Sequence, residues 1–153
     1  MNNVKIENAK LLESLNKIDD EDKVRKIIFK AIKSGAKKLQ KGTQTVFKRK
    51  MPTANERMIK GVKVRNDASY MESKVHIMGD HRNKWFEKGT EKRYIQNYQH
   101  SNFQRKIHNK NTGKSNYRGH IKGIGFFEEA QTLYAKDIES AMDNVIEKEL
   151  NKL

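Results

Sequence analysis

The clearest hydrophobic pattern of the chain lies between residues 22 and 47. Its apolar positions recur every three or four residues, which is typical of one face of an α-helix. They are Val24, Ile27, Ile28, Ala31, Ile32, Ala36 and Leu39. Lysines occupy another stripe of the same segment: Lys23, Lys26, Lys30, Lys33, Lys37 and Lys41. The pattern predicts a long basic helix that begins after the acidic run 19–22 and ends near Gly42, or a turn or two later at Phe47.

Two other segments have a helical pattern. Residues 8–18 predict a short amphipathic helix, and residues 127–150 predict a longer one with an acidic outer face. The apolar face of the longer helix consists of Ala130, Tyr134, Ile138, Ala141, Met142, Val145 and Ile146. Gly35 lies inside the long basic helix, where it is unfavourable by ~1 kcal/mol relative to alanine. We therefore expect the backbone of another segment to come close at Gly35.

The pattern changes to a period of two in the middle of the chain. Val62 and Val64 alternate with polar residues, and so do Val75 and Ile77, which predicts two half-buried strands. A third extended segment is expected from Trp85 to Thr90. The predicted fold class is α+β, an antiparallel β-meander flanked by the long basic helix and a C-terminal helix. The length fits a single domain, 1–153.

Two stretches show neither helical nor strand periodicity. They lie near residues 44–58, which include the only proline, Pro52, and at 91–118. With few apolar anchors, such loops do not offset an ordering cost of ~1–2 kcal/mol per residue. We predict that both are mobile in the isolated protein and become ordered mainly on assembly.

The charge is strongly positive and unevenly distributed. The net charge of +14 combines −2 in residues 1–21, +20 in residues 22–122 and −4 in residues 123–153. A basic middle part favours binding to nucleic-acid phosphates. Alternatively, the acidic end of one copy contacts the basic middle of the next. The residues expected to contact a DNA backbone are Lys26, Lys30, Lys33, Lys37 and Lys41.

Several functional classes are disfavoured. The chain has no cysteine, and its five histidines have no metal-ligand spacing. Its apolar runs are too short to cross a bilayer. Asp80, His81 and Glu87 include acid–base groups, but no nucleophile stands at a recognisable turn and no complete phosphate-binding loop is present. We predict no enzymatic activity, no catalytic or metal-binding residue, no cofactor and no membrane contact.

Two aromatic clusters are the most specific local features. One is Trp85-Phe86-Glu87-Lys88-Gly89-Thr90, in which Gly89 is suited to a positive φ. The other is Gly125-Phe126-Phe127-Glu128-Glu129-Ala130, in which Gly125 allows a turn into the last helix. The predicted structural and assembly residues are Trp85, Phe86, Glu87, Gly89, Thr90, Phe126 and Phe127. We expect the aromatic side chains of the first cluster to tie the sheet to a helix or to a neighbouring subunit.

In order and spacing, these features resemble the phage tail-component family of the lambdoid type, which includes tail-completion and neck proteins. The matching segments are the basic helix Ala31 to Leu39, the cluster Trp85 to Thr90 and the helix entry Phe126 to Ala130. The Thr-Gly step usual in the family is lost at Pro52 to Ile59, and 91–118 is longer than the usual connection.

The resemblance implies a virion structural protein with a central antiparallel sheet. It would form a ring of about six copies at the head–tail junction or at the top of the tail tube. Its partners would be copies of itself and other connector or tail proteins, and it would be assembled in the cytoplasm of a bacterial host. The alternative function is that of a basic, non-specific nucleic-acid-binding protein.

Overall fold

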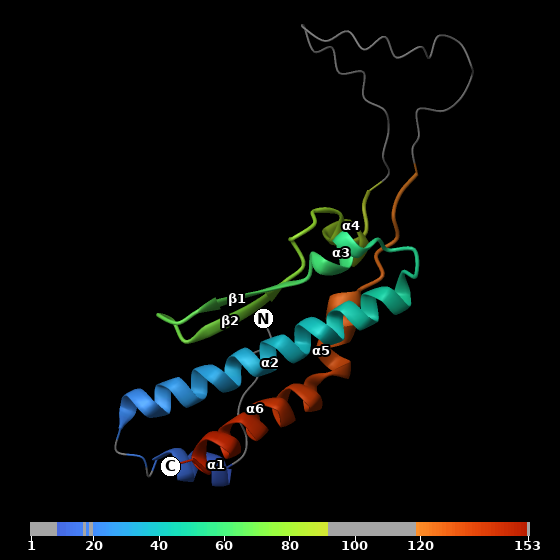
Figure 1. The fold of residues 1–153 in the computed structure, drawn as a ribbon. Coiled ribbons are helices and arrows are strands. Elements are labelled where there is room, and N and C mark those ends of the chain that lie inside the picture. The colour runs from blue at the N-terminus through green and yellow to red at the C-terminus, as the bar shows by residue number, and fades with distance from the viewer. Residues whose placement is uncertain (1–8, 17, 19, 92–118, 153) are drawn as a thin grey trace, which may run out of the picture.

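The computed structural model describes residues 9–16, 18, 20–91 and 119–152, and these form an α+β fold that is mostly helical (Figure 1). Its helices are α1 (Ala9–Asn16), α2 (Glu21–Lys50), α3 (Glu56–Lys60), α4 (Arg82–Lys88), α5 (Phe126–Leu133) and α6 (Ala135–Leu150). Its strands are β1 (Lys63–Asp67) and β2 (Glu72–His76). The predicted α+β class is confirmed.

Helix α2 is the longest element, and at ~1.5 Å per residue it extends for about 45 Å. It begins as the acidic run predicts, because the carboxylate of Asp20 accepts a hydrogen bond from the backbone N–H of Lys23 (3.0 Å). It continues to Lys50 because Val46 and Phe47 are fully buried. The stretch 44–58 is therefore largely helical, since it contains the end of α2 and the start of α3. Residues 92–118 of the second predicted loop lie outside the described residues.

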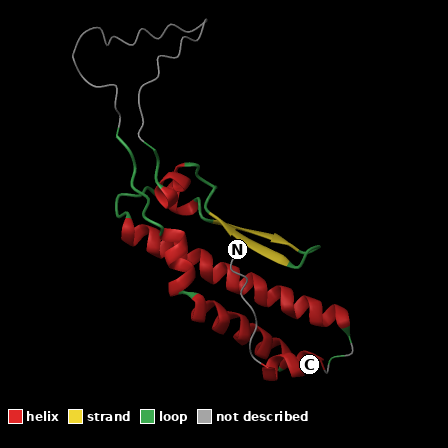
Figure 2. Cartoon of the chain, turned by 180° about the vertical axis from the view of Figure 1, so that it is seen from behind, coloured by secondary structure: helices red, strands yellow, loops and turns green. Residues whose placement is uncertain are grey.

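Helix α2 lies between the β-hairpin on one side and α6 on the other (Figures 1 and 2). The sheet is thus an outer layer, whereas the family resemblance implied a central one. Helix α6 runs antiparallel to α2, with Lys30 beside Glu149 and Lys38 beside Asp137. The contact at Gly35 is with side chains of α6 rather than with a backbone: a β-carbon there would lie 2.9 Å from the side chain of Met142.

The sheet has two strands rather than a three-stranded meander. Strands β1 and β2 pair in antiparallel register, from Lys63 opposite His76 to Asp67 opposite Glu72. The predicted third strand is wrong, because residues 82–88 form helix α4. Among the described residues, extended pairing outside the hairpin is limited to an isolated bridge between Gly89 and Lys122.

The C-terminal helix is also interrupted. The sequence predicts one helix over 127–150, whereas α5 ends and α6 begins around Tyr134. Gly42 of α2 makes room for this residue, since a β-carbon on Gly42 would lie 2.6 Å from the Tyr134 ring. The break therefore coincides with a tight ring-on-helix contact.

Two apolar clusters form the core, one toward each end of α2. The cluster toward its N-terminus is aliphatic and consists of Leu15, Ile27, Ala31, Ile138, Met142 and Ile146. The cluster toward its C-terminus consists of Val46, Phe47, Met58, Val62, Phe126 and Ala130. The rings of Phe47 and Phe126 stack there with centroids 4.1 Å apart.

Candidate functional site

The two aromatic clusters of the sequence meet in space. The backbone N–H of Thr90 donates to the carbonyl oxygen of Ile121 (2.9 Å), and the Thr90 hydroxyl accepts from the N–H of Ile121 (3.0 Å). Farther along the same two segments, the backbone N–H of Ile124 donates to the carbonyl oxygen of Phe86 (2.8 Å). We call this contact of residues 86–90 with residues 121–128 the junction.

Glu87 is the central polar side chain of the junction. Its carboxylate accepts hydrogen bonds from the backbone N–H groups of Phe127 (2.8 Å) and Glu128 (3.3 Å). These groups belong to the first turn of α5, whose own N-cap residue, Gly125, has no side chain to satisfy them. A carboxylate at this position also opposes the positive end of the helix dipole. Glu87 therefore caps α5 through Phe127, which lies 40 residues later in the sequence.

Glycines allow the two backbones of the junction to approach each other. Gly89 has a φ of 84°, the positive φ that its sequence context predicts. A β-carbon on Gly89 would lie 2.8 Å from the N of Gly123, and one on Gly123 would lie 2.7 Å from the carbonyl carbon of Lys88. Gly125 has a φ of 54° immediately before α5, so it does provide the expected turn into the helix.

The four aromatic residues of the clusters have different surroundings. Phe126 is fully buried, and Phe86 and Phe127 are half-buried against the same core cluster. Trp85 is 39% exposed and meets His81 edge-on, with ring centroids 5.2 Å apart. The expectation that Trp85 ties the sheet to a helix or to a neighbouring subunit stays a prediction.

A buried polar group beside the junction was missed by the sequence reading. Asn83 is fully buried, and its amide donates to the carbonyl oxygens of Met58 (2.8 Å) and Ile77 (3.1 Å). Asp80 accepts from the Arg82 guanidinium (2.7 Å), which holds the pKa of this carboxyl well below its ordinary value. Asp80 shortly before a helical pattern is a common helix-start signal. The sequence therefore contains a start signal for helix α4, although the pattern around Trp85 and Phe86 predicts an extended segment.

The carboxylates considered for acid–base chemistry already have structural partners. Asp80 is paired with Arg82, and Glu87 caps α5. Within residues 9–16, 18, 20–91 and 119–152, no cluster of three or more His, Asp or Glu side chains is placed to hold a metal ion. No helix in this described part of the chain is long and apolar enough to cross a membrane.

An apolar cavity of about 500 Å³ lies between α2, β2, α5 and α6. Ile32 and Leu39 of α2, Val75 of β2, Phe127 of α5 and Ile138 of α6 are among its lining residues. The hairpin thus leaves part of the apolar surface of α2 uncovered. Phe127 joins this cavity to the junction, because its backbone N–H is bound by Glu87.

Opposite charges pair between α2 and the C-terminal helices within one chain. Lys30 binds Glu149 (2.8 Å), and Lys38 binds Asp137 (3.2 Å). Arg49 and Lys50 both contact Glu129. The acidic C-terminal segment is thus partly neutralised by its own subunit.

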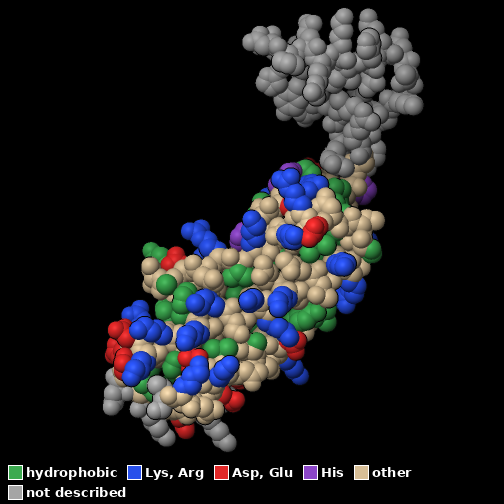
Figure 3. Space-filling model, in the orientation of Figure 1, with side chains coloured by type: hydrophobic (Ala, Val, Ile, Leu, Met, Phe, Trp, Pro, Cys, Tyr) green, Lys and Arg blue, Asp and Glu red, His purple; other side chains and the backbone are tan. Residues whose placement is uncertain are grey.

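The lysines predicted to contact DNA lie along one exposed surface of α2. Lys26, Lys30, Lys33, Lys37 and Lys41 are all exposed, whereas Ala31, Gly35 and Val46 on the other side of α2 are buried. Figure 3 shows Lys and Arg side chains along the course of α2. The structure therefore places these five lysines on one exposed side of α2.

Comparison with known proteins adds no relative: no family model, no curated protein and no solved structure matches the chain.

Proposed function

We propose that the protein is a virion structural subunit that forms a ring at the head–tail junction or at the top of the tail tube of a phage. The observation that carries the proposal is the contact of residues 86–90 with residues 121–128 inside the subunit. The segments Trp85–Thr90 and Phe126–Ala130, on which the family resemblance depends, are joined by the Glu87 carboxylate and by backbone hydrogen bonds. Their residue types are explained by structural roles, because Glu87 caps a helix and Gly89 permits close backbone contact.

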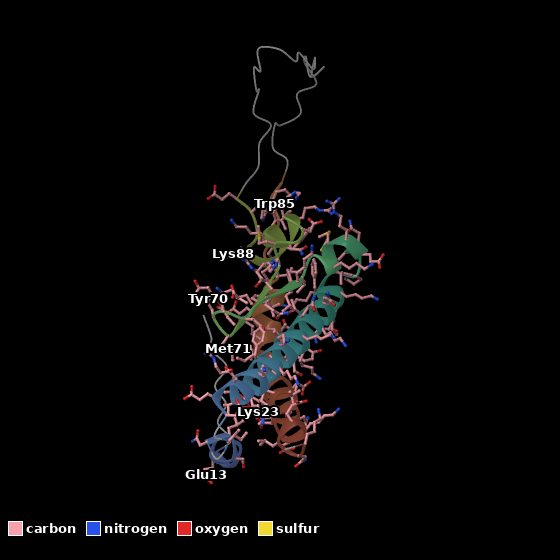
Figure 4. All side chains as sticks on the ribbon, turned by 60° about the vertical axis from the view of Figure 1, so that its left-hand side comes forward. Glu13, Lys23, Tyr70, Met71, Trp85 and Lys88 are labelled. Carbon is pink, nitrogen blue, oxygen red and sulfur yellow. The ribbon has the colours of Figure 1, made fainter. Side chains whose placement is uncertain are left out.

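Exposed apolar side chains provide surfaces for neighbouring subunits or connector proteins. Tyr70 is 80% exposed near the turn of the hairpin, and Met78 after β2 is 54% exposed. Trp85 of α4 is 39% exposed, and Leu133 of α5 is 55% exposed. Figure 4 shows Tyr70 and Trp85 in separate parts of the subunit. A ring needs two different contact surfaces on each copy, and separated apolar side chains meet that requirement.

The proposal is tested by the mass and shape of the assembled protein. Mass photometry and negative-stain electron microscopy, with and without candidate connector and tail proteins, should show a ring of about six copies. Replacing Tyr70 or Trp85 with serine should weaken the ring without unfolding the subunit, which circular dichroism checks. A protein that stays monomeric with all these partners, and that is absent from purified virions, would contradict the proposal.

The alternative, a free nucleic-acid-binding protein, predicts a different result in the same experiment. Such a protein would bind nucleic acid as a monomer and would form no ring without it. The exposed apolar side chains favour the structural subunit, because phosphate binding does not require them.

A further inference from the structure

We propose that the exposed lysine surface of α2 binds the phosphate backbone of duplex DNA without sequence preference. This lysine surface consists of Lys26, Lys30, Lys33, Lys37, Lys41 and Lys48. The proposal names a partner that ring formation does not require. It can therefore fail while the ring proposal stands, and the reverse is also possible.

The geometry of the helix places these lysines in one line. At ~100° per residue, the six positions fall within an arc of roughly 80° around the axis of α2. The opposite side of the helix carries its buried residues, among them Ala31, Gly35 and Val46. All six lysines are exposed, so the ammonium groups can reach a partner without any change in the packing of α2.

Most of the positive charge of this surface is uncompensated. Lys30 is paired with Glu149, and Lys33 lies 4.7 Å from the centroid of the Phe29 ring. The other four lysines have no carboxylate partner among the residues that the structure describes. In contrast, Lys38, Arg49 and Lys50 of the same helix pair with acids of α5 and α6. The fold thus neutralises one side of α2 and leaves the other side charged.

The length and chemistry of the lysine surface fit duplex DNA. From Lys26 to Lys48 the helix rises about 33 Å, close to the ~34 Å of one turn of the duplex. Lysine ammonium groups act as point charges toward phosphate. Arginine, asparagine and glutamine, which read bases by bidentate contacts, are not among these six residues. Gln44, the amide on this side of the helix, donates to the carbonyl oxygen of Val62 instead (3.4 Å). The surface therefore predicts backbone binding without sequence reading.

The competing occupant is the acidic side of α6 in a second copy of the chain. Glu139, Asp143 and Glu147 lie along that helix without an ion pair among the described residues. Duplex DNA is favoured because the acids of α6 nearest to α2, Asp137 and Glu149, already pair within their own subunit. The remaining acids are also fewer than the lysines, so a second copy would leave positive charge exposed.

The experiment measures binding of the purified full chain to two duplexes of unrelated sequence, each of roughly 30 base pairs, by fluorescence anisotropy. Salt is varied from roughly 50 to 200 mM. The test variant is Lys33→Gln, Lys37→Gln and Lys41→Gln together. The matched control, with the same loss of charge, is Lys63→Gln, Arg65→Gln and Lys84→Gln, three exposed residues of β1 and α4 that have no acidic partner among the described residues.

The wild type should bind both duplexes equally. The test variant should lower the slope of log K against log salt by about three, one unit for each lost phosphate contact, and should weaken binding at least tenfold. The control should keep most of the affinity and most of the slope. Circular dichroism should show that both variants remain folded.

Three results would overturn the proposal. The wild type binds no DNA in low salt, the two variants lose affinity equally, or the test variant abolishes self-association while DNA binding is unchanged. The last result would assign the lysine surface to the α6 acids of a second copy.

Discussion

The two ends of α2 are stabilised in different ways. Toward the N-terminus, α1 and α6 contact the helix through aliphatic side chains, with ion pairs at the rim. Toward the C-terminus, short elements meet around the Phe47–Phe126 stack, and they are held by backbone hydrogen bonds, glycine contacts and the side chains of Glu87 and Asn83. Long helices with a broad apolar face tolerate changes that preserve their volume. Short elements depend on individual residues, so the second end should be the more sensitive to mutation.

The largest effect is expected from removing the aromatic stack. Phe126→Ala deletes a fully buried ring and should lower the free energy of unfolding by ~3–5 kcal/mol. Urea denaturation of the purified protein measures this loss. Leu133→Ala, a truncation in the same helix at a side chain that is 55% exposed, is the control and should have a much smaller effect. Equal losses in the two variants would mean that this end has no packed core.

The second-largest effect is expected at Gly89, where it distinguishes the cost of a steric contact with the neighbouring backbone from the cost of a strained positive φ. Gly89→Ala should destabilise the protein by ~1–3 kcal/mol, because φ is positive there and the new β-carbon meets the Gly123 and Ile121 backbone. Gly119→Ala is the matched control, since its φ is 79° but no atom of the described residues lies within 4 Å of the new β-carbon. Thermal unfolding should show the larger loss for Gly89→Ala. A larger loss for Gly119→Ala would mean that strain, rather than the junction contact, determines the cost.

The helix cap should have a smaller effect. Glu87→Ala leaves the N–H groups of Phe127 and Glu128 without their acceptor and should cost ~1 kcal/mol. Glu87→Gln should cost less, because the amide oxygen still accepts one hydrogen bond, so the fold should remain intact. Hydrogen exchange at the two amides measures the cap directly, with Glu91→Ala, an exposed acid near the junction, as control. Unchanged protection in Glu87→Ala would show that another group caps α5.

The smallest effect is expected at the aliphatic end, from the ion pairs of Glu149. Lys152 and Lys30 lower the pKa of Glu149 from 4.5 to about 2. A lowered carboxylate pKa stabilises the folded state at any pH above the unfolded value, and this contribution disappears as pH falls from about 4.5 toward about 2. Glu149→Gln should therefore be less stable than the wild type at neutral pH, and the difference should vanish by about pH 2.

Urea unfolding of Glu149→Gln and of the wild type at several pH values tests the direction of this pH dependence. Glu139→Gln, which removes an exposed acid of the same helix that has no ion pair among the described residues, should show no such dependence on pH. A difference between Glu149→Gln and wild type that grows as pH falls would contradict the assignment.

Hydrophobic periodicity predicted the secondary structure well in the long segment of α2 and in the hairpin. Residues 24–39 predicted α2, and the alternation at Val62–Val64 and Val75–Ile77 placed the hairpin. The prediction failed at residues 82–88, because a short segment with two aromatic residues fits a strand end as well as a helix. Asp80 provides a local start signal for this helix, because its carboxylate accepts from the backbone N–H of Arg82. The tertiary contact that accompanies the helix is that of the Asn83 amide with the carbonyl oxygen of Met58.

The sequence identified residues of the candidate site but not their contact with one another. Sequence reasoning selected Glu87, Gly89 and Phe127, but as members of two separate clusters. It did not predict that Glu87 caps the helix that contains Phe127, because a contact across 40 residues leaves no periodic trace in one sequence. The lysine stripe that the sequence predicts from Lys23 to Lys41 does lie on the exposed side of α2, since helix geometry alone places these residues together.

The sequence by itself determined the local elements, the basic stripe of α2 and the positive φ of Gly89, because these depend on neighbours a few residues away. Only the tertiary structure decided that the hairpin lies outside α2, that residues 82–88 are helical and that Glu87 meets α5. It also decided which acids of the C-terminal helices neutralise Lys30, Lys38, Arg49 and Lys50. The physical reason is that burial, capping and ion pairing each require contact between two segments that lie far apart in the sequence. A local sequence pattern describes only one of these segments at a time.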